Sequence, residues 1–293
     1  MNRILILILL ILLLISVILY LNFKKSRYIY SYYKNTNKIN VIEIINNIKT
    51  DSSKTIPKVI YQLYKGNKGD EIPEDIKNNI EHLKNISPKW KHILLRDDEI
   101  EEFILEHYGN DILNIYNMIN PRYGAARADF FRYLLMYVKG GVYLDIKSTV
   151  LHNLDVIIKD NTHYILSHWG KGGNYWRKLL NNKYGEFQQW HIITPPGHYF
   201  LKEVIKQVII NILSYSINDG VGKKGVLNLT GPIAYSIVIL KLIKDNDNED
   251  YIIFRDNKNI GLIYTIYNNT ITHEKKLFKT HYSKLKEPIV INN

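Results

Sequence analysis

The 293-residue sequence contains no cysteine. Disulfide bridges, cysteine-ligated zinc and thiol catalysis are therefore excluded. The sequence does not indicate whether the protein works in an oxidising or a reducing compartment. Dense basic runs are also missing, apart from Lys-Lys-Ser-Arg at 24–27, so the formal net charge of +11 comes from scattered lysines. The usual patterns of nucleic-acid-binding modules are missing as well, and we expect no nucleic-acid partner. This basic balance fits an anionic membrane surface, a phosphorylated substrate or simply a solubilising surface.

A long apolar run near the N-terminus predicts a membrane anchor. Residues 4–21 carry no charged side chain, and a helix of this length reaches about 27 Å, close to the thickness of a bilayer core. No small-x-small cleavage site follows, so we expect an uncleaved, single-pass anchor over 1–23. Basic residues flank both ends of the run, and the orientation in the membrane stays open. A polar stem is expected over 24–54 and one catalytic domain over 55–293.

The stretch 124–147 (GAARADFFRYLLMYVKGGVYLDIK) predicts a helix, a turn and a strand. Residues 125–138 repeat apolar side chains at helical spacing and contain neither proline nor glycine. The Gly-Gly pair that follows supplies the positive-φ residue that commonly ends a helix. Residues 142–144 (Val-Tyr-Leu) favour a strand, and Asp145 comes at its carboxyl end. Open α/β sheets bind their ligands at that edge.

Three charged residues converge on this predicted strand end. Asp129 and Arg132 are three residues apart and therefore share one face of the helix, and Asp145 ends the strand. Arginine binds phosphate through two parallel hydrogen bonds, and carboxylates accept hydrogen bonds from sugar hydroxyls or ligate a divalent cation. The combination predicts a site for a phosphorylated, hydroxyl-rich ligand. Simpler interpretations stay open: a helix salt bridge for the first two residues and a turn for the third.

The order small-small-x-x-Asp-x-x-Arg-Tyr, followed by Gly-Gly-Val-Tyr-Leu-Asp, resembles the glycosyltransferases with a DXD-containing sugar-binding region. That family includes the initiating α-1,6-mannosyltransferase of yeast and, more distantly, the glucosyltransferase domains of large clostridial toxins. Asp129, Arg132, Tyr143 and Asp145 fall at the family's spacing. The family's second acid is replaced by Lys147.

The lysine at this position bears on the Mn2+ or Mg2+ that the resemblance implies, because a protonated lysine cannot ligate a metal. Two arrangements stay open. In the first, Asp145 holds the metal together with His281. His281 weakly resembles a late histidine that completes metal coordination in related folds. In the second, Lys147 and Arg132 neutralise the donor's diphosphate without a metal.

Weaker matches extend the resemblance over about 56–281. Tyr64 ends the predicted strand 59–64, where the family's aromatic residue stacks on the donor base. Thr230 and Gly231 match a Thr-Gly-Pro motif that borders the donor sugar. His191 lies where the family has an acceptor-facing polar residue. A packed aromatic, a helix cap and a structural histidine are the respective simpler interpretations.

The resemblance implies a GT-A-like α/β fold, with a mostly parallel sheet flanked by helices. It implies transfer of a hexose, with retention, from a UDP- or GDP-sugar to a hydroxyl of a glycan, lipid or protein. Asp145, Asp129 and Arg132 are the expected catalytic residues. The expected donor-binding residues are Tyr64, Asp129, Arg132, Tyr143, Asp145, Lys147, Thr230 and Gly231. Lys147 keeps open an alternative, a membrane-anchored protein that binds nucleotide sugars or glycans without catalysis.

Overall fold

The computed structural model describes residues 13, 14, 16, 18, 20, 21, 41–159, 163–170, 185–245, 250–267 and 282–291. The chain forms two compact units, 1–44 and 45–293. The described positions between 13 and 21 are helical and exposed. Most of the predicted anchor and stem lies outside the described residues, so the boundaries 1–23, 24–54 and 55–293 stay predictions.

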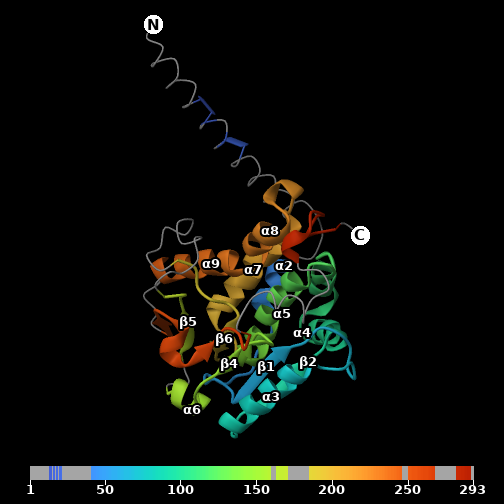
Figure 1. Ribbon diagram of the computed structural model, residues 1–293. Coiled ribbons are helices and arrows are strands. Elements are labelled where there is room, and N and C mark those ends of the chain that lie inside the picture. The colour runs from blue at the N-terminus through green and yellow to red at the C-terminus, as the bar shows by residue number, and fades with distance from the viewer. Residues whose placement is uncertain are drawn as a thin grey trace. The chain divides into compact units, whose positions relative to one another are not determined.

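Helices and strands are interspersed along the described residues from 41 onward (Figure 1). The helices are α2 Val41–Asn47, α3 Glu74–Ile86, α4 Asp97–Asn117, α5 Gly124–Lys139, α6 Leu154–Ile157, α7 Tyr199–Leu213, α8 Gly222–Leu229 and α9 Pro232–Asp245. The strands are β1 Val59–Leu63, β2 Lys91–Leu95, β3 Gly141–Leu144, β4 Thr149–Val150, β5 Tyr164–Ser167, β6 His191–Thr194, β7 Tyr251–Phe254 and β8 Leu262–Ile263. Short 3-10 helices are η2 Ile217–Asp219, η3 Asn257–Ile260 and η4 Tyr282–Lys284.

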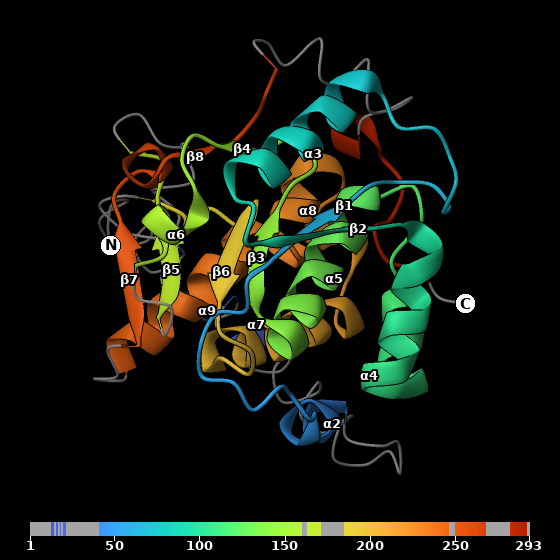
Figure 2. The same ribbon diagram turned by 90° about the horizontal axis from the view of Figure 1, so that it is seen from below.

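The main sheet has the strand order β2-β1-β3-β6-β5-β7, which can be followed across Figure 2. β1 is parallel to β2 and β3, and β5 is parallel to β7, whereas β6 is antiparallel to both of its neighbours. Strand β6 therefore runs against the other five. The expected mixed α/β architecture with a mostly parallel sheet is confirmed. β4 and β8 form a separate antiparallel pair.

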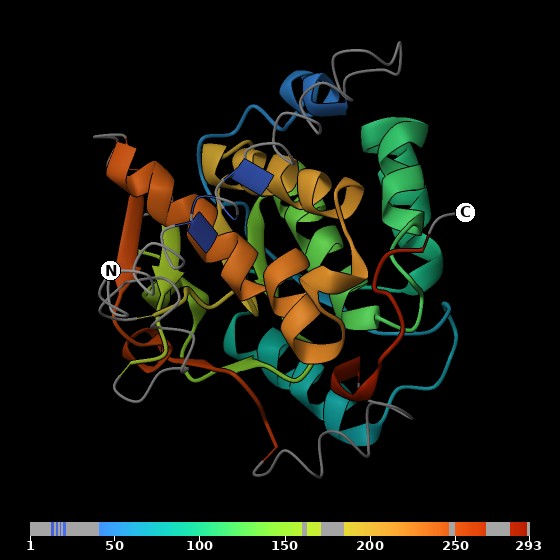
Figure 3. The same cartoon turned by 90° about the horizontal axis from the view of Figure 1, so that it is seen from above.

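Helices cover both faces of the sheet. In Figure 1 the strands lie between α7, α8 and α9 on one side and α3 on the other. α5, α7, α8 and α9 pack against one another, and Figure 3 looks onto this helical layer. The core is aliphatic and aromatic, and helix α5 is buried along most of its length. Because Asp129 and Arg132 are buried with it, they must find partners inside the protein.

The turn between α5 and β3 explains the Gly-Gly pair. Gly140 has φ 61° and Gly141 has φ 98°, a region that residues with side chains rarely adopt. A Cβ on Gly140 would lie 2.6 Å from the backbone N of Pro196, and one on Gly141 would lie 2.8 Å from the carbonyl O of Val59. The pair thus allows both the turn and the close approach of neighbouring chains. It delivers Asp145 to the carboxyl end of β3.

The stretch 222–245, which spans α8 and α9, is long and apolar enough to cross a membrane, and 56% of its most apolar 18-residue window is buried. Core helices of water-soluble proteins meet the same criterion. This is not the stretch predicted as the anchor, and the N-terminal anchor stays a prediction.

Candidate active site

Helix α5 and strand β3 bring the three predicted charged residues together. The Arg132 Nη2 atom lies 3.2 Å from Asp129 Oδ1 and 3.1 Å from Asp145 Oδ1. The side chains of Arg132 and Asp129 are 6% and 7% exposed, whereas that of Asp145 is 23% exposed. One guanidinium therefore joins a buried acid on the helix to a partly accessible acid at the strand end.

Gln189 completes the network, and the sequence analysis did not identify it. Arg132 Nη1 donates to the backbone O of Gln189 at 2.8 Å and to its Oε1 at 2.9 Å. Gln189 Nε2 donates in turn to Asp129 Oδ1 at 2.9 Å. The guanidinium also lies 4.8 Å from the centre of the Tyr143 ring. The available signal was weak: two glutamines shortly before a predicted strand.

Both carboxylate oxygens of Asp129 have protein partners. Oδ1 contacts Arg132 and Gln189, and Oδ2 accepts a hydrogen bond from Thr230 Oγ1 at 3.1 Å. Burial raises the pKa of Asp129 to about 6, against the opposing effects of the Arg132 charge and the Gln189 hydrogen bond. Asp129 is thus placed to hold Arg132, and each of its oxygens already has a protein partner.

Asp145 is arranged differently. Its Oδ1 contacts Arg132 and accepts a hydrogen bond from the Tyr143 hydroxyl at 3.2 Å. Its backbone O accepts from Gln62 Nε2 at 3.2 Å, and its backbone N donates to the Trp190 carbonyl at 2.8 Å. Within the described ranges, no side chain bonds Oδ2. Asp145 is therefore fixed on one side and can accept a hydrogen bond from a ligand on the other.

Tyr143 and Lys147 lie on either side of Asp145 in the sequence and have different environments. Tyr143 is buried beneath Arg132, and burial raises the pKa of its phenol. Lys147 is 9% exposed. Its Nζ donates to the Tyr264 hydroxyl at 2.8 Å and lies 4.2 Å from the centre of that ring. Tyr264 was also missed from the sequence.

The remaining predicted donor-side residues have local structural explanations. The Tyr64 ring lies 4.8 Å from the guanidinium carbon of Arg96, just after β1. Thr230 ends α8 and donates to Asp129. A Cβ on Gly231 would lie 2.8 Å from the Leu227 Cα, so the α8–α9 junction itself requires glycine there. Base stacking by Tyr64 and sugar contacts by Thr230 and Gly231 stay predictions.

His191 is buried at the start of β6, which the reversed direction of that strand brings beside the end of β3. Its Nε2 lies 2.7 Å from Ser167 Oγ, and Ser167 donates to Gln188 Oε1 at 3.0 Å. Burial lowers the pKa of His191 to about 3, so the ring is neutral at physiological pH. A role facing the acceptor stays a prediction.

The described side chains do not fit a divalent ion. Across the described ranges, no three His, Asp or Glu residues are grouped closely enough to hold one. Arg132 and Tyr143 already contact Asp145 Oδ1, and Lys147 stands where a second acid would ligate. The other predicted ligand, His281, lies outside the described residues.

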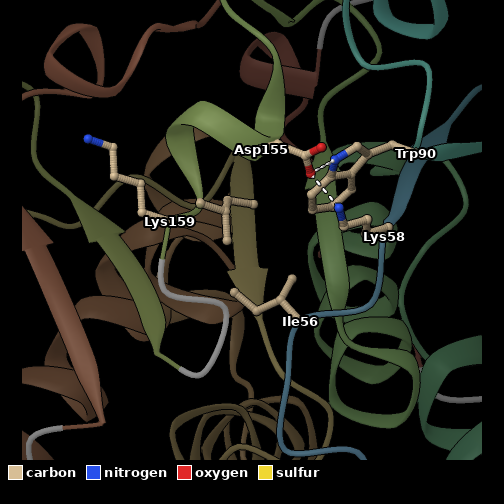
Figure 4. A pocket seen from close by; sticks show the side chains of 6 residues that line it. Ile56, Lys58, Trp90, Asp155 and Lys159 are labelled. Atoms are coloured by element: carbon tan, nitrogen blue, oxygen red, sulfur yellow. Dashed lines mark hydrogen bonds and ion pairs between the residues drawn. The ribbon is translucent and has the colours of Figure 1, made fainter.

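A cavity of about 380 Å³ lies at the opposite, amino-terminal edge of the sheet (Figure 4). Asp155 Oδ1 accepts there from Trp90 Nε1 at 3.0 Å and lies 2.7 Å from Lys58 Nζ, while Lys159 points away from them. Lys58 precedes β1 and Trp90 precedes β2. None of the predicted site residues lines this cavity, and it supplies a second acid–base cluster for comparison.

Comparison with known proteins gives consistent results. Residues 73–164, which include most of the charged network, match the family described as "Glycosyltransferase sugar-binding region containing DXD motif". The initiation-specific α-1,6-mannosyltransferase of Candida albicans is 26% identical over 67% of this chain and 55% of its own length. Inositol phosphoceramide mannosyltransferase 3 of Schizosaccharomyces pombe is 29% identical over 69% of this chain and 50% of its own length. This chain spans about half the length of these curated relatives.

Among solved structures, the PaToxG glycosyltransferase is similar with a TM-score of 0.45 and 14% identity, over 76% of this chain and 79% of its own. The resemblance predicted from residues 124–147 is confirmed: residues 73–164 match the glycosyltransferases whose sugar-binding region contains the DXD motif, and the chain is similar to curated mannosyltransferases.

Proposed function

We propose that this chain is a glycosyltransferase with a GT-A-like fold. In this proposal it moves a hexose from a UDP- or GDP-sugar to an acceptor hydroxyl on a glycan, lipid or protein. One observation carries the proposal: Arg132 joins Asp129 to Asp145 at the carboxyl end of β3, inside the family-matching region. The names of its relatives, two mannosyltransferases, support a hexose donor.

The residues of the network have separate roles in this proposal. Asp145 Oδ2 accepts hydrogen bonds from hydroxyls of the donor sugar or ribose, because Oδ1 is already bound by Arg132 and Tyr143. Asp129 and Gln189 hold the guanidinium of Arg132 in place, so they are positioning residues. Arg132 in turn fixes the rotamer of Asp145. A ligand then meets a carboxylate that is already oriented, which lowers the cost of ordering it on binding.

Transfer requires the bond between the sugar C1 and the diphosphate oxygen to break. The sugar then develops oxocarbenium character, and negative charge grows on the departing diphosphate. Among the described residues beside Asp145, no general base stands out: burial lowers the pKa of His191 to about 3, which makes it a weak base, and its Nε2 is bonded to Ser167. This arrangement supports a retaining reaction in which the departing phosphate takes the acceptor proton, as the family resemblance implies.

We place the enzyme at a membrane, held by the apolar segment 1–23 with the larger unit beyond it. The charge-free run 4–21 supports this placement. Deleting residues 1–27 should release the protein from the membrane fraction with its turnover intact. Recovery of the folded, truncated protein in the membrane pellet would show that the attachment lies elsewhere.

A panel of UDP- and GDP-sugars tests the proposed reaction. Purified protein should release UDP or GDP from one donor, and a hydroxyl acceptor should accelerate that release. Proton NMR of the early product should show the same anomeric configuration as the donor. An inverted product would refute retention, and the absence of turnover with every donor would refute transfer.

The second candidate is a non-catalytic nucleotide-sugar binder, and Lys147 at the position of the family's second acid favours it. The same panel separates the two candidates when binding is measured beside turnover. A donor that binds tightly and stays intact over hours, with acceptors present, would support the binder.

A further inference from the structure

Lys147 is a buried cation without an acidic partner. It is 9% exposed, and no carboxylate of the described residues lies within ion-pair distance of its Nζ. The bond that its ammonium makes is to the neutral Tyr264 hydroxyl. Burying a charge is costly unless it is paired, and among the described residues this lysine has only the hydroxyl and the ring of Tyr264 to offset that cost. A cost of this kind is expected where a ligand supplies the missing charge.

The surroundings of Lys147 tie it to the predicted donor site. The Lys147 backbone O accepts from Ile266 N at 2.8 Å, and Ser148 Oγ donates to the Tyr264 carbonyl at 2.7 Å. The Tyr264 ring lies 5.6 Å from the Trp190 ring, centre to centre, and the Trp190 carbonyl binds Asp145 N. Lysine, tyrosine and Asp145 therefore belong to one connected cluster at the carboxyl edge.

The electrostatics of a neighbouring phenol, that of Tyr282, agree with that placement. Burial raises the pKa of Tyr282, and Asp129, Tyr264 and Asp145 raise it further while Arg132 opposes them. Tyr264 and the charged network therefore act on the same side chain.

The charges of this cluster already balance before any ligand arrives. Arg132 contacts both Asp129 and Asp145, so its charge is shared between two acids. A donor diphosphate would bring at least two negative charges into this setting. Of the two cations in the cluster, Lys147 is the one with no acid beside it among the described residues.

We propose that Lys147, aligned by Tyr264, receives the donor's diphosphate directly and stands in for the metal that a second acid would hold. This inference rests on the proposed function for the identity of the ligand. The ammonium supplies charge-assisted hydrogen bonds to phosphate oxygens. The Tyr264 hydroxyl keeps the ammonium in place until the ligand comes. The donor site is thereby specific for a phosphorylated leaving group and works without a divalent ion.

Calorimetric titration with inorganic pyrophosphate, UDP and GDP tests the proposal, because these probes need no turnover. Lys147→Met keeps the apolar stem of the side chain, removes its charge, and breaks no ion pair of the described residues. Lys58→Met, at the opposite edge of the sheet, is the matched loss of one charge. We expect the affinity for pyrophosphate, and for UDP or GDP, to fall about tenfold to a hundredfold in Lys147→Met and less than threefold in Lys58→Met. Wild-type affinity should be the same in EDTA and in Mn2+.

Tyr264→Phe keeps the ring and removes the hydroxyl. It should weaken pyrophosphate binding about threefold to tenfold, since the ammonium loses its alignment but stays charged. If Lys147→Met does not fold, Tyr264→Phe alone tests whether pyrophosphate binding depends on the aligned ammonium. Retained affinity in either folded variant, or loss of wild-type affinity in EDTA, would overturn the proposal.

The outcomes keep this inference separate from the proposed function. If pyrophosphate binding depends on Lys147 but no donor is turned over, the anion site stands and the transferase proposal fails. If donors are turned over while Lys147→Met binds and reacts normally, the transferase proposal stands and the lysine has no part in it.

Discussion

Two acid–base clusters lie at opposite edges of one sheet, and burial distinguishes them. At the carboxyl edge, Arg132 joins Asp129 and Asp145 through side chains that are 6%, 7% and 23% exposed. At the amino edge, Lys58 and Asp155 pair through side chains that are 50% and 30% exposed. The exposed pair has the shorter contact, 2.7 Å against 3.1 and 3.2 Å. Contact distance therefore does not indicate which of the two clusters has a function.

The pKa values of Asp155 and Asp129 shift in opposite directions, because the two carboxylates differ in burial. Hydrogen bonds from Lys58 and Trp90 lower the pKa of Asp155, and burial opposes them only weakly because that carboxylate is partly exposed. Burial raises the pKa of Asp129 even though an arginine is beside it. Exposed pairs contribute little to stability, whereas a buried network is costly to build and more costly to break. The buried cluster is therefore the one that a functional requirement best explains.

The largest expected difference between the two edges concerns stability. Arg132→Ala leaves the buried Asp129 without its cation, so we expect it to lower the free energy of unfolding by about 3–5 kcal/mol. Lys58→Ala should change it by less than about 1 kcal/mol, because that pair is solvated. Urea denaturation measures both. If Arg132→Ala does not fold, Arg132→Lys, which keeps the charge but not the geometry, replaces it. Equal losses at the two edges would contradict the comparison.

A smaller difference concerns pH. Since the pKa of Asp129 is raised to about 6, its carboxyl is charged above that pH and neutral below it. Arg132 then loses one anchor as the pH falls, and we expect the rate of donor turnover to drop by up to about tenfold per pH unit below 6. Asp155→Asn should leave the profile unchanged. A flat profile between pH 5 and 7 would contradict this assignment.

The smallest expected effect comes from Thr230→Val. The hydroxyl of Thr230 donates to Asp129 Oδ2, which stabilises the charged carboxylate. Losing that hydrogen bond should destabilise the fold by about 1 kcal/mol and move the acidic limb of the pH profile upward. Thermal melts and rate profiles of the variant measure the two effects. A limb that stays in place would mean that another group controls it.

Local patterns predicted part of this site and missed the rest for a physical reason. Helix α5, the Gly-Gly turn and β3 follow from periodicity and turn chemistry within 24 consecutive residues, and they place Asp129, Arg132 and Asp145. Gln189 lies 57 residues from Arg132, and Tyr264 lies 117 residues from Lys147. Such partners depend on the order of strands in the sheet, which no local pattern contains.

The same limit explains what was left open about Asp129 and His191. Spacing put Asp129 near the carboxyl edge, and the family resemblance put His191 on the acceptor side; in the structure His191 lies beside the end of β3. It gave no sign that Thr230 would bind the second oxygen of Asp129, or that Ser167 would bind His191. Whether a side chain faces a ligand or the protein interior depends on these distant contacts.

The central claim is that the buried cluster, and not the exposed one, acts on the donor. Asp145→Asn and Asp155→Asn make the same change at the two edges, and kcat/KM for release of UDP or GDP from the donor is the measurement. Asp145→Asn removes the negative charge of the carboxylate that accepts hydrogen bonds from the donor hydroxyls, so kcat/KM should fall about a hundredfold or more. Asp155→Asn should stay within about twofold of wild type. Wild-type turnover in a folded Asp145→Asn variant, or equal losses in both, would contradict the account.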